Sequence, residues 1–412
     1  MSDELLHPDE ALRLVVELGR EAWRAQGVAD LEEVAIADAL GRTMPGALAS
    51  AVDHPPFDKS AMDGFAVAEG SPGSAAPGPW RVVETIAAGA MSVRSLGPGE
   101  VARIMTGAPV PGGTSFVQRV EWTGPVEGRD DLVRFTEPER GDNIIRRGEN
   151  LRVGEELLAP RTLRPGDIGL LASSGFATVR VARRPIVGIV STGDELASPG
   201  TILGPASIYD SNGPQLAAQA GEAGAEARFY GAVPDDEAAL AAAFARALGE
   251  CDVVLMSGGV SMGDFDHVPR ILGELGVERL FHRIAMRPGK PTWFGRRGQV
   301  AVFGLPGNPL STFVNFEVFM RPHLAARMGL DWTRPILRLP LGSEISRRGA
   351  DRVEYLPVRI AMEEGRSVAL PLRYHGSSML SVLAEATGLA RLELGVEGVE
   401  KGGFVDVGLL RA

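Results

Sequence analysis

The chain has 412 residues, more than one ordinary hydrophobic core holds, so we expect about three domains. With 42 Lys and Arg against 53 Asp and Glu, the formal net charge is -11, which argues against a nucleic-acid-binding protein, because such proteins present basic surfaces. The single cysteine, Cys251, excludes an internal disulfide framework and a cysteine-built zinc site, and favours a cytoplasmic protein. The longest charge-free run, 298–316, contains two prolines and the first residues are acidic, so we expect no membrane span and no signal peptide.

The first third of the chain changes from helical to β-rich texture. A helix is expected from Pro8, because Asp9 and Glu10 suit a first turn and apolar residues follow at helical spacing. Short β-prone runs separated by Pro/Gly turns then indicate a β-rich domain up to about residue 140. These runs are 80–85, 101–104, 115–121 and 132–136. A short helix at 168–172 and a strand at 177–181 are expected next.

Between about 185 and 330 the order strand, loop, helix repeats, which predicts a parallel, doubly wound sheet. The expected strands are 186–190, 227–232, 252–256, 279–284 and 300–303, and the expected helices are 213–221, 236–248 and 310–320. Beyond about 335 only strands are expected, at 336–341, 353–360, 368–372, 389–394 and 404–409. These predict a small barrel or sandwich, so the fold class is multidomain α/β plus β.

The loops after the sheet strands are where a ligand is expected, because open α/β sheets bind ligands beyond the carboxyl ends of their strands. Glycines there let backbone N–H groups approach an anion, and helix starts behind them add a positive dipole end, so a phosphate-like ligand is favoured. Six acids in these loops would repel such a ligand unless a hard cation such as Mg²⁺ bridges them. They are Asp194, Glu195, Asp235, Asp236, Asp264 and Asp266.

Two cations, Arg287 and Lys290, follow another strand, so the set indicates phosphate-anhydride chemistry with a metal. Structural interpretations stay open for the single pieces. Asp235 and Asp266 are also good helix N-caps, and the two cations are compatible with ordinary surface charges. From composition alone, the segment 57–65 is compatible with a loop ending in an Asp-Gly turn.

The segment 259–263 satisfies G-x-S-x-G after a strand, the pattern of a hydrolase nucleophile elbow with Ser261 as nucleophile. Two extra residues precede it and a long loop follows, whereas an elbow needs a tight strand-to-helix turn. The histidines that a triad requires have no local support. They are His282, His323 and His375. A serine hydrolase is therefore a less favoured alternative.

Eight segments occur in the order typical of one family. They are 57–67 (FDKSAMDGFAV), 106–111 (TGAPVP), 143–150 (NIIRRGEN), 191–196 (STGDEL), 257–263 (SGGVSMG), 287–291 (RPGKP), 305–311 (LPGNPLS) and 376–381 (GSSMLS). With these motifs the chain resembles the molybdopterin molybdenumtransferases, the MoeA and gephyrin E-domain family. The resemblance implies four parts: a segmented linking domain (1–50 and 141–182), a β-rich domain (51–140), a MogA-like α/β molybdopterin-binding domain (183–330) and a C-terminal β-barrel (331–412).

The resemblance also implies a reaction and an assembly. Molybdate and adenylylated molybdopterin would be the substrates, and cleavage of the phosphate anhydride would release AMP as molybdenum enters the dithiolene, with Mg²⁺ as cofactor. The protein would be a homodimer with the site between the α/β domain of one subunit and the β-rich domain of the other. It would also contact the upstream molybdopterin adenylyltransferase.

Site residues follow from the resemblance, position by position. The implied catalytic residues are Asp58, Glu195, Asp235, Asp266, Arg287 and Lys290, of which Glu195, Asp235 and Asp266 would hold the metal. The implied substrate-binding residues are Ser60, Asp63, Thr106, Arg147, Thr192, Gly193, Ser257, Gly258, Gly259, Ser261, Pro306, Gly307, Asn308, Pro309 and Ser378. Asp58, Ser60 and Asp63 would act on the partner subunit's sheet loops.

Four positions depart from the family pattern. Asn150 replaces a carboxylate and Arg287 replaces a lysine, which changes the donor geometry toward an oxyanion. Lys59 stands where Asn is usual, and Phe65 where Tyr is usual. A divergent paralogue, a non-catalytic scaffold and the sister adenylyltransferase activity therefore stay open as alternatives, as does tungstate in place of molybdate.

Overall fold

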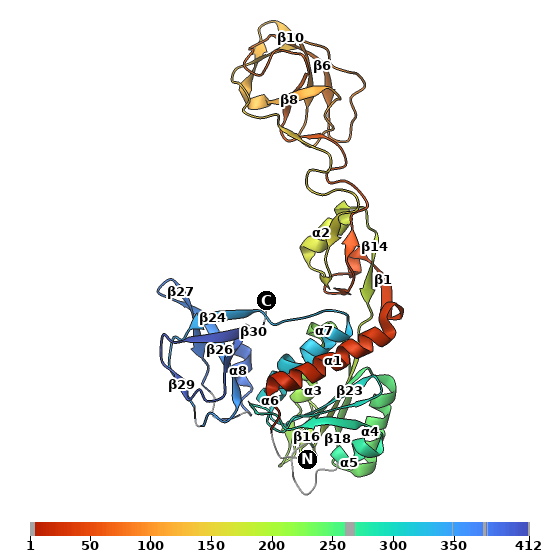
Figure 1. Ribbon diagram of the computed structural model, residues 1–412, viewed down its shortest axis with the longest axis vertical. Helices are drawn as coiled ribbons and strands as arrows, with labels where there is room; N and C mark the ends of the chain where they lie inside the picture. Colours follow the sequence, from red (N-terminus) through yellow and green to blue (C-terminus); the bar gives the residue numbers. More distant parts are fainter. Residues whose placement is uncertain (1–4, 260–267, 348, 374–375, 377, 411–412) are drawn as a thin grey trace. The chain divides into compact units, whose positions relative to one another are not determined.

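The computed structural model describes residues 5–259, 268–347, 349–373, 376 and 378–410, and they form two compact units (Figure 1). The larger unit comprises 1–34, 41–45 and 180–412, and the smaller unit comprises 35–40 and 46–179. The strands β1 (Leu31–Ala35) and β14 (Thr178–Ala182) cross from one set of residues to the other.

The smaller unit is built on a six-stranded sheet with the order β8-β5-β7-β6-β10-β9. Its strands are β5 (Gly64–Ala68), β6 (Trp80–Ile86), β7 (Glu100–Ile104), β8 (Thr114–Arg119), β9 (Thr123–Val126) and β10 (Arg129–Phe135). The four predicted strands are confirmed, but β5 falls in a motif for which composition favoured a loop. All five β5 residues are buried, so the strand lacks the alternation that reveals a half-exposed strand.

Short elements complete the smaller unit. They are η2 (Ile36–Asp38), β3 (Leu48–Ala49), β4 (Lys59–Ser60), η3 (Val120–Trp122), β11 (Ile144–Ile145), β12 (Glu156–Leu158), β13 (Arg161–Thr162) and α2 (Pro165–Ser173). The helix α2 contains the predicted segment 168–172. It begins at Pro165, and Asp167 accepts the Arg164 backbone N–H at 2.8 Å, which fixes its first turn.

The larger unit contains a six-stranded sheet with the order β18-β15-β19-β23-β22-β20. Its strands are β15 (Ile186–Thr192), β18 (Glu226–Val233), β19 (Val253–Ser257), β20 (Glu278–His282), β22 (Trp293–Arg297) and β23 (Val300–Leu305). The prediction of a parallel sheet is correct for β18, β15, β19 and β23 and incomplete beyond them. The unpredicted strand β22 runs antiparallel between β23 and β20, because only a two-residue turn joins it to β23.

Helices cover both faces of this sheet. They are α1 (Pro8–Gln26), α3 (Asn212–Glu222), α4 (Glu237–Glu250), α5 (Val268–Glu274), α6 (Pro309–Asn315), and α7 (Arg321–Arg327), with a π-helical segment η4 (Phe316–Met320) between the last two. The short elements η1 (Gly27–Asp30), β2 (Thr43–Met44), β16 (Leu196–Ala197) and β17 (Ile208–Tyr209) lie in the same unit. The predicted helix 310–320 thus continues to Arg327.

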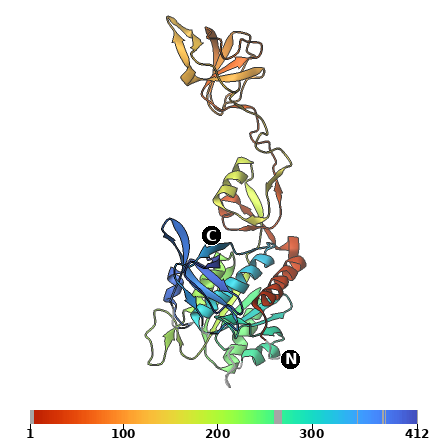
Figure 2. The ribbon, with the colours of Figure 1, turned by 60° about the vertical axis from the view of Figure 1, so that its left-hand side comes forward.

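The helix α1 packs along α7, and Figures 1 and 2 both show the two side by side. Ala11, Val15 and Leu18 recur on its buried face at helical spacing. Gly19 permits the close approach, because a Cβ there would lie 2.7 Å from the carbonyl oxygen of His323. His323 in turn lies 2.8 Å, through Nδ1, from the carbonyl oxygen of Val15.

The C-terminal part of the larger unit is a small barrel. Its strands are β21 (Met286–Arg287), β24 (Ile336–Pro340), β25 (Ile345–Ser346), β26 (Val353–Glu363), β27 (Arg366–Pro371), β28 (Gly388–Leu392), β29 (Gly398–Val399) and β30 (Phe404–Leu409), with one short helix, α8 (Ser381–Glu385). The path β26-β28-β30-β24 returns to β27, the other neighbour of β26, through a bridge between Leu341 and Ala369. This bridge closes the ring, as the barrel prediction requires.

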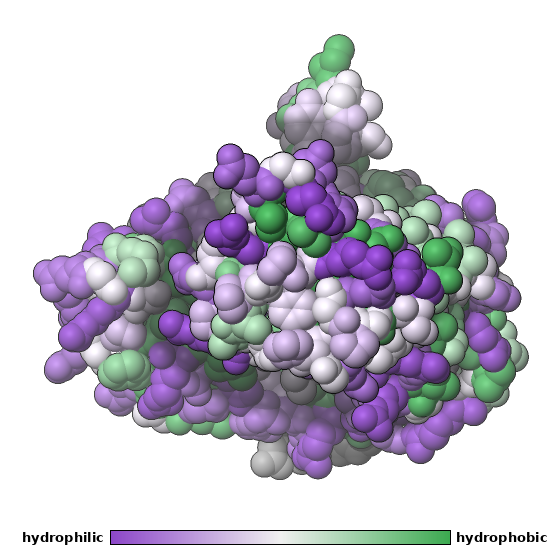
Figure 3. Space-filling view, turned by 90° about the horizontal axis from the view of Figure 1, so that it is seen from above, coloured by the Kyte–Doolittle hydropathy of each residue, from purple (hydrophilic) through white to green (hydrophobic). Residues whose placement is uncertain are grey.

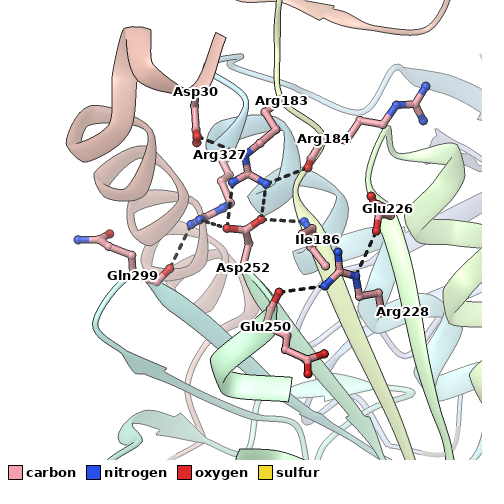
Figure 4. Close-up of polar contacts among 10 residues, drawn as sticks. All are labelled: Asp30, Arg183, Arg184, Ile186, Glu226, Arg228, Glu250, Asp252, Gln299 and Arg327. Carbon is pink, nitrogen blue, oxygen red and sulfur yellow. Dashed lines mark hydrogen bonds and ion pairs between the residues drawn. The ribbon is translucent and has the colours of Figure 1, made fainter. Parts of the chain in front are cut away.

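A partly buried ion cluster fixes the amino end of the sheet (Figure 4). Asp252, just before β19, accepts two hydrogen bonds from Arg183, at 2.9 and 3.1 Å, and one from Arg327 at 2.7 Å. The Ile186 backbone N–H donates to it at 2.7 Å, so both carboxylate oxygens are satisfied. Burial alone would raise the pKa of Asp252, but the hydrogen bonds from Arg183 and the charge of Arg327 outweigh it and hold that pKa below its ordinary value.

The described surface is mostly polar. Figure 3 shows hydrophilic side chains spread over the visible face, with smaller apolar patches between them. Among the helices of the described residues, none combines the length and the apolar character that crossing a membrane requires.

Candidate functional site

The largest group of predicted site residues meets at the carboxyl end of the sheet. From β15 the chain crosses to β18 on one side, and from β19 it crosses toward the other side, so the loops after β15 and β19 flank a topological switch point. A cavity of about 570 Å³ opens there. Its predicted lining residues are Thr192, Glu195, Ser257, Gly258, Gly259, Pro306, Gly307, Asn308, Pro309 and Ser378. We call this cavity the switch-point pocket.

Backbone geometry explains the glycines of the pocket. Gly258 has a φ of 97°, and a Cβ on it would lie 2.6 Å from the carbonyl oxygen of Thr192. Its N–H donates to the carbonyl oxygen of Leu305 at 3.1 Å. The loops after β15, β19 and β23 therefore touch through backbone atoms, which only glycine at this position permits.

One side chain that the motifs did not single out ties these loops together. Asn212, in the first turn of α3, donates from Nδ2 to the hydroxyl of Ser257 and to the carbonyl oxygen of Gly307, both at 2.7 Å. Because the Gly307 oxygen can only accept, the amide nitrogen must face it, which fixes the amide orientation. Asn212 Oδ1 then remains buried and has no hydrogen-bond partner among the described residues.

Asp210, two residues earlier, presents a second acceptor of this kind. Its Oδ1 accepts the backbone N–H of Gly213 at 3.0 Å, at the start of α3. Its Oδ2 is buried and, within the described part of the chain, makes no hydrogen bond. Asp210 and Asn212 both line the pocket and are only 3% and 8% exposed. The local sequence signal is weak here, because Asp and Asn at the start of a helix are usually caps.

A second cavity, of about 350 Å³, adjoins the switch-point pocket and shares Pro291, Pro306 and Asn308 with it. Three cationic residues line it: Arg287, Lys290 and Arg352. We call it the cation pocket. The structure thus brings the two predicted cations together with Arg352, which comes from the barrel. Sequence reasoning missed Arg352, because it lies more than sixty residues away in an unmarked loop.

The loop that carries the two predicted cations packs against the buried side chains of Asn315 and Thr292. Gly289 has a φ of 106°, and a Cβ there would lie 2.1 Å from the buried amide nitrogen of Asn315. The hydroxyl of Thr292 lies 2.7 Å from the carbonyl oxygen of Gly289 and 2.6 Å from Asn315 Oδ1. On its other side Arg287 pairs in register with Glu354 of the barrel strand β26. The cation pocket is therefore a preformed feature of the larger unit.

The predicted acids are placed less uniformly. Glu195 lies exposed at the switch-point pocket, whereas Asp235 does not line it. The backbone N–H of Asp235 donates to Asp194 Oδ1 at 3.1 Å, which joins the loops after β15 and β18. The N-cap of α4 is Asp236, which accepts the Ala239 N–H, so the capping interpretation of Asp235 was wrong by one residue. Gly193, with a φ of 145°, precedes these acids at the end of β15.

Some predicted residues cannot be placed. Ser261, Asp264, Asp266 and His375 lie outside the described residues. Within 5–259, 268–347, 349–373 and the remaining described positions, no group of three or more His, Cys, Asp or Glu side chains has the arrangement of a metal site. The predicted metal set therefore depends on Asp266. His323 lies fully buried beside α1, away from the pocket lining, which removes one candidate member of a serine triad.

The predicted residues of the smaller unit form two local pairs. Asp58 accepts the Arg147 backbone N–H at 2.7 Å. Asp63 accepts the backbone N–H and the hydroxyl of Thr106 at 2.6 and 2.8 Å, and these hydrogen bonds lower the pKa of Asp63. Ser60 differs, because its side chain is buried and its hydroxyl donates to the Met62 carbonyl oxygen at 2.6 Å, and its predicted ligand contact stays a prediction.

The geometry can now be compared with known proteins. Three family models match the chain: "MoeA N-terminal region (domain I and II)" over 6–175, "Probable molybdopterin binding domain" over 188–326 and "MoeA C-terminal region (domain IV)" over 339–410. The molybdopterin molybdenumtransferase of Bacillus subtilis is 35% identical over 409 residues, which cover 98% of this chain and 94% of the relative. The chain belongs to the molybdopterin molybdenumtransferase family.

Further matches agree with this family. The molybdopterin molybdenumtransferase of Staphylococcus aureus strain N315 is 31% identical over 381 residues, or 91% of this chain and 90% of the relative. Two crystal structures of the molybdopterin biosynthesis MoeA protein from Pyrococcus horikoshii have TM-scores of 0.79 and 0.82 at 30% and 27% identity. They cover 99% and 98% of this chain and all of their own.

The family membership confirms several sequence predictions. The multidomain fold, the transferase class and the place in molybdenum cofactor biosynthesis are as predicted. The comparisons favour this enzyme class over the scaffold, adenylyltransferase and serine hydrolase alternatives. One departure from the family pattern also has a structural setting: Phe65 is buried among apolar side chains of the smaller unit, where a phenol hydroxyl would require a partner.

Proposed function

We propose that the protein inserts molybdenum from molybdate into adenylylated molybdopterin and releases AMP. The observation that carries this proposal is the contact between two cavities of different character. The switch-point pocket is lined by backbone groups, uncharged polar groups and the carboxylates of Glu195 and Asp210, and the cation pocket beside it is lined by Arg287, Lys290 and Arg352. Two such cavities suit a ligand with a ring system and a diphosphate in the switch-point pocket and a separate oxyanion in the cation pocket.

The cation pocket supplies the oxyanion site. Three side chains that carry positive charge favour a tetrahedral dianion, and the guanidinium groups of Arg287 and Arg352 can each donate two hydrogen bonds to it. Lys290 adds a mobile point charge. The shared residues Pro291, Pro306 and Asn308 leave the two cavities adjacent, so an anion held by the cations would lie next to the ligand in the switch-point pocket.

Mg²⁺ would be held in the loose manner that this ion prefers, by one or two carboxylates completed by water and substrate phosphate, and Glu195 is the proposed ligand that lines the pocket. Glu195 and Asp235 would hold it, together with Asp266, and the hydrogen bond between Asp194 and Asp235 keeps the two acidic loops adjacent. When bound, the ion neutralises charge on the diphosphate. The protein's own groups bind and orient the diphosphate and the oxyanion, and exclude water from the anhydride.

The role of the smaller unit is also a proposal. Asp58, Asp63, Thr106 and Arg147 would complete the site on a second copy of the chain in a homodimer. Side-chain exposure of 43% for Asp58 is compatible with such a contact. The same proposal includes a division of the chain into four parts at 50, 140, 182 and 330, and contact with the adenylyltransferase that makes the substrate. It also includes a cytoplasmic location, which is compatible with the buried thiol of Cys251.

The direct test is AMP release from adenylylated molybdopterin by the purified protein with Mg²⁺, with and without molybdate. We expect release that depends on molybdate and is at least about a hundredfold slower in Lys290→Ala, because a charged group at a developing anion contributes a few kcal/mol. Arg270→Ala, on the exposed face of α5, is the control for loss of a positive charge elsewhere in the same unit. Release by the folded wild-type protein that is indifferent to molybdate would refute the proposal.

A further inference from the structure

The switch-point pocket contains buried acceptor atoms that its own structure does not use. In general, buried polar side-chain atoms in proteins have partners, because leaving one unpaired costs about 1 to 3 kcal/mol. Asp210 Oδ2, Asn212 Oδ1 and Thr192 Oγ1 line this pocket and have no hydrogen-bond partner within the described chain. Such a cluster at one wall indicates that a ligand supplies the missing donors.

The orientation of these atoms is fixed by the rest of each side chain. Both hydrogens of the Asn212 amide are taken by Ser257 and Gly307, so its oxygen is left as an acceptor in a residue that lines the pocket. Asp210 is held by its other oxygen, which accepts the Gly213 N–H. Gly213 has no room for a side chain, since a Cβ there would lie 2.6 Å from Asp210 Oδ2. The wall is therefore a rigid pair of acceptors.

The chemistry of the wall distinguishes between ligands. A metal ion is disfavoured at Asp210, because this carboxylate already accepts an N–H at the positive dipole end of the eleven-residue helix α3. Two acceptors match a ring edge with two adjacent N–H donors. The aminopyrimidinone ring of a pterin has such an edge, with its 2-amino group beside N3–H, whereas adenine alternates a donor with an acceptor. The side chains of Ile208, Tyr209 and Leu380 supply apolar wall for a flat ring.

We propose that Asp210 and Asn212 determine the specificity of the pocket for a pterin ring, Asp210 accepting the 2-amino group and Asn212 accepting N3–H. The inference rests on the proposed function for the identity of the full substrate, but it concerns recognition and not the transfer step. It also orients the ligand: the ring lies against α3 and the phosphate-bearing side extends toward Pro306 and the cation pocket.

The test uses two stable ring compounds, pterin and lumazine, which differ in one group: lumazine carries an oxo group where pterin has the 2-amino group. Binding to the full-length protein is measured by titration calorimetry. We expect the wild type to bind pterin at least about tenfold more tightly than lumazine. In Asp210→Asn, Oδ1 still accepts the Gly213 N–H, so an amide donor replaces the free acceptor and the preference shifts toward lumazine.

Asp236→Asn is the matched control, because Asp236 also accepts a backbone N–H at the start of a helix, α4, that packs on the same sheet, but it lies outside the pocket. It should keep the wild-type preference. Equal weakening of both compounds in Asp210→Asn would assign Asp210 a structural role and overturn the inference, as would a wild type without preference or one in which adenosine displaces pterin. A wild type that releases AMP with molybdate but does not prefer pterin would overturn this inference alone, while pterin recognition without molybdate-dependent release would overturn only the proposed function.

Discussion

The two ends of the larger unit's sheet differ in whether their polar side chains have hydrogen-bond partners. At the amino end, Asp252 has every oxygen paired with Arg183, Arg327 or a backbone N–H. At the carboxyl end, Asp210 and Asn212 keep acceptor atoms without partners among the described residues. Paired groups add to the stability of the fold, and unpaired groups at a cavity are available to a ligand. The contrast predicts that changes at the two ends separate stability from activity.

The largest expected effect is on stability at the amino end. Asp252→Ala removes the carboxylate that pairs with Arg327, whose side chain is only 3% exposed, and leaves Arg183 with Asp30, at 3.3 Å, as its carboxylate partner. Removing one partner of a buried ion pair costs about 3 to 5 kcal/mol, so we expect a loss of this size in the free energy of unfolding by urea. Molybdate-dependent AMP release per folded molecule should change little. A decrease of less than about 1 kcal/mol in the free energy of unfolding would contradict the assignment of the amino end to stability.

The next largest expected effect is on the pH dependence of stability. It concerns His323, which is buried but does not line the pocket, so it should affect stability and not activity. Burial lowers the pKa of His323 from its ordinary 6.5 to about 4. The unfolded chain therefore binds a proton that the folded chain does not between these values, so stability is complete above pH 6.5 and is lost as the pH falls toward 4. The loss amounts to about 3 kcal/mol at most.

The measurement is urea unfolding of the wild type and His323→Gln at several pH values. The variant should be less stable at pH 7 and should show a flatter dependence between pH 6.5 and 4.5. Carboxylates with lowered pKa also lose their stabilising effect below about pH 5, but they do so equally in both proteins, so the difference between the two profiles reports His323. Parallel pH profiles for the two proteins would contradict the assignment. Activity per folded molecule should stay unchanged at pH 7, since His323 does not line the pocket.

At the carboxyl end the expected effect is on activity first. Gly258→Ala would place a Cβ 2.6 Å from the Thr192 carbonyl oxygen at a φ of 97°. Strain of this kind costs about 1 to 3 kcal/mol, so urea unfolding should show a modest loss. Because the loops that line the pocket would move apart, AMP release should fall by tenfold or more. Gly221→Ala, in the last turn of α3 where a Cβ would meet no atom within 4 Å, is the control and should be neutral or slightly stabilising.

The smallest effect concerns a surface pair of the same chemistry as the buried cluster. Asp331 lies 2.7 Å from Arg20, with side-chain exposures of 81% and 48%. Asp331→Ala should change the free energy of unfolding by less than about 1 kcal/mol, and less still at high salt. A loss as large as that of Asp252→Ala would show that burial is not what distinguishes the two pairs.

Much of this organisation could be predicted from the sequence. The rule that ligands bind beyond the carboxyl ends of strands directed attention to the loops after β15, β19 and β23, and residues of all three line the switch-point pocket. Strands with alternating or β-branched patterns were found, whereas β5 was missed because it is rich in Gly and Ala and begins directly after Asp63, where an Asp-Gly pair predicts a turn. The direction of β22 is not encoded in a local pattern and depends on the short turn to β23.

The remaining site residues depend on tertiary structure. Asp210 and Asn212 have the local sequence of helix caps, and only their burial and unpaired atoms distinguish them. Arg352 reaches the cation pocket from the barrel because β21 pairs with β26, a contact between distant segments. Ser60 is a different case, since its place in a family motif predicts ligand contact, and in the described unit its hydroxyl donates to the carbonyl oxygen of Met62.

The central claim, that the loops at the carboxyl end bind the two substrates in adjacent cavities, is tested most directly by anomalous X-ray scattering at the molybdenum edge. Crystals of the wild type and of Lys290→Ala would be soaked in molybdate with sulfate as competitor. The account predicts one molybdenum peak among Arg287, Lys290 and Arg352 in the wild type, and its loss in the variant. A peak elsewhere, or one that persists unchanged without Lys290, would contradict it.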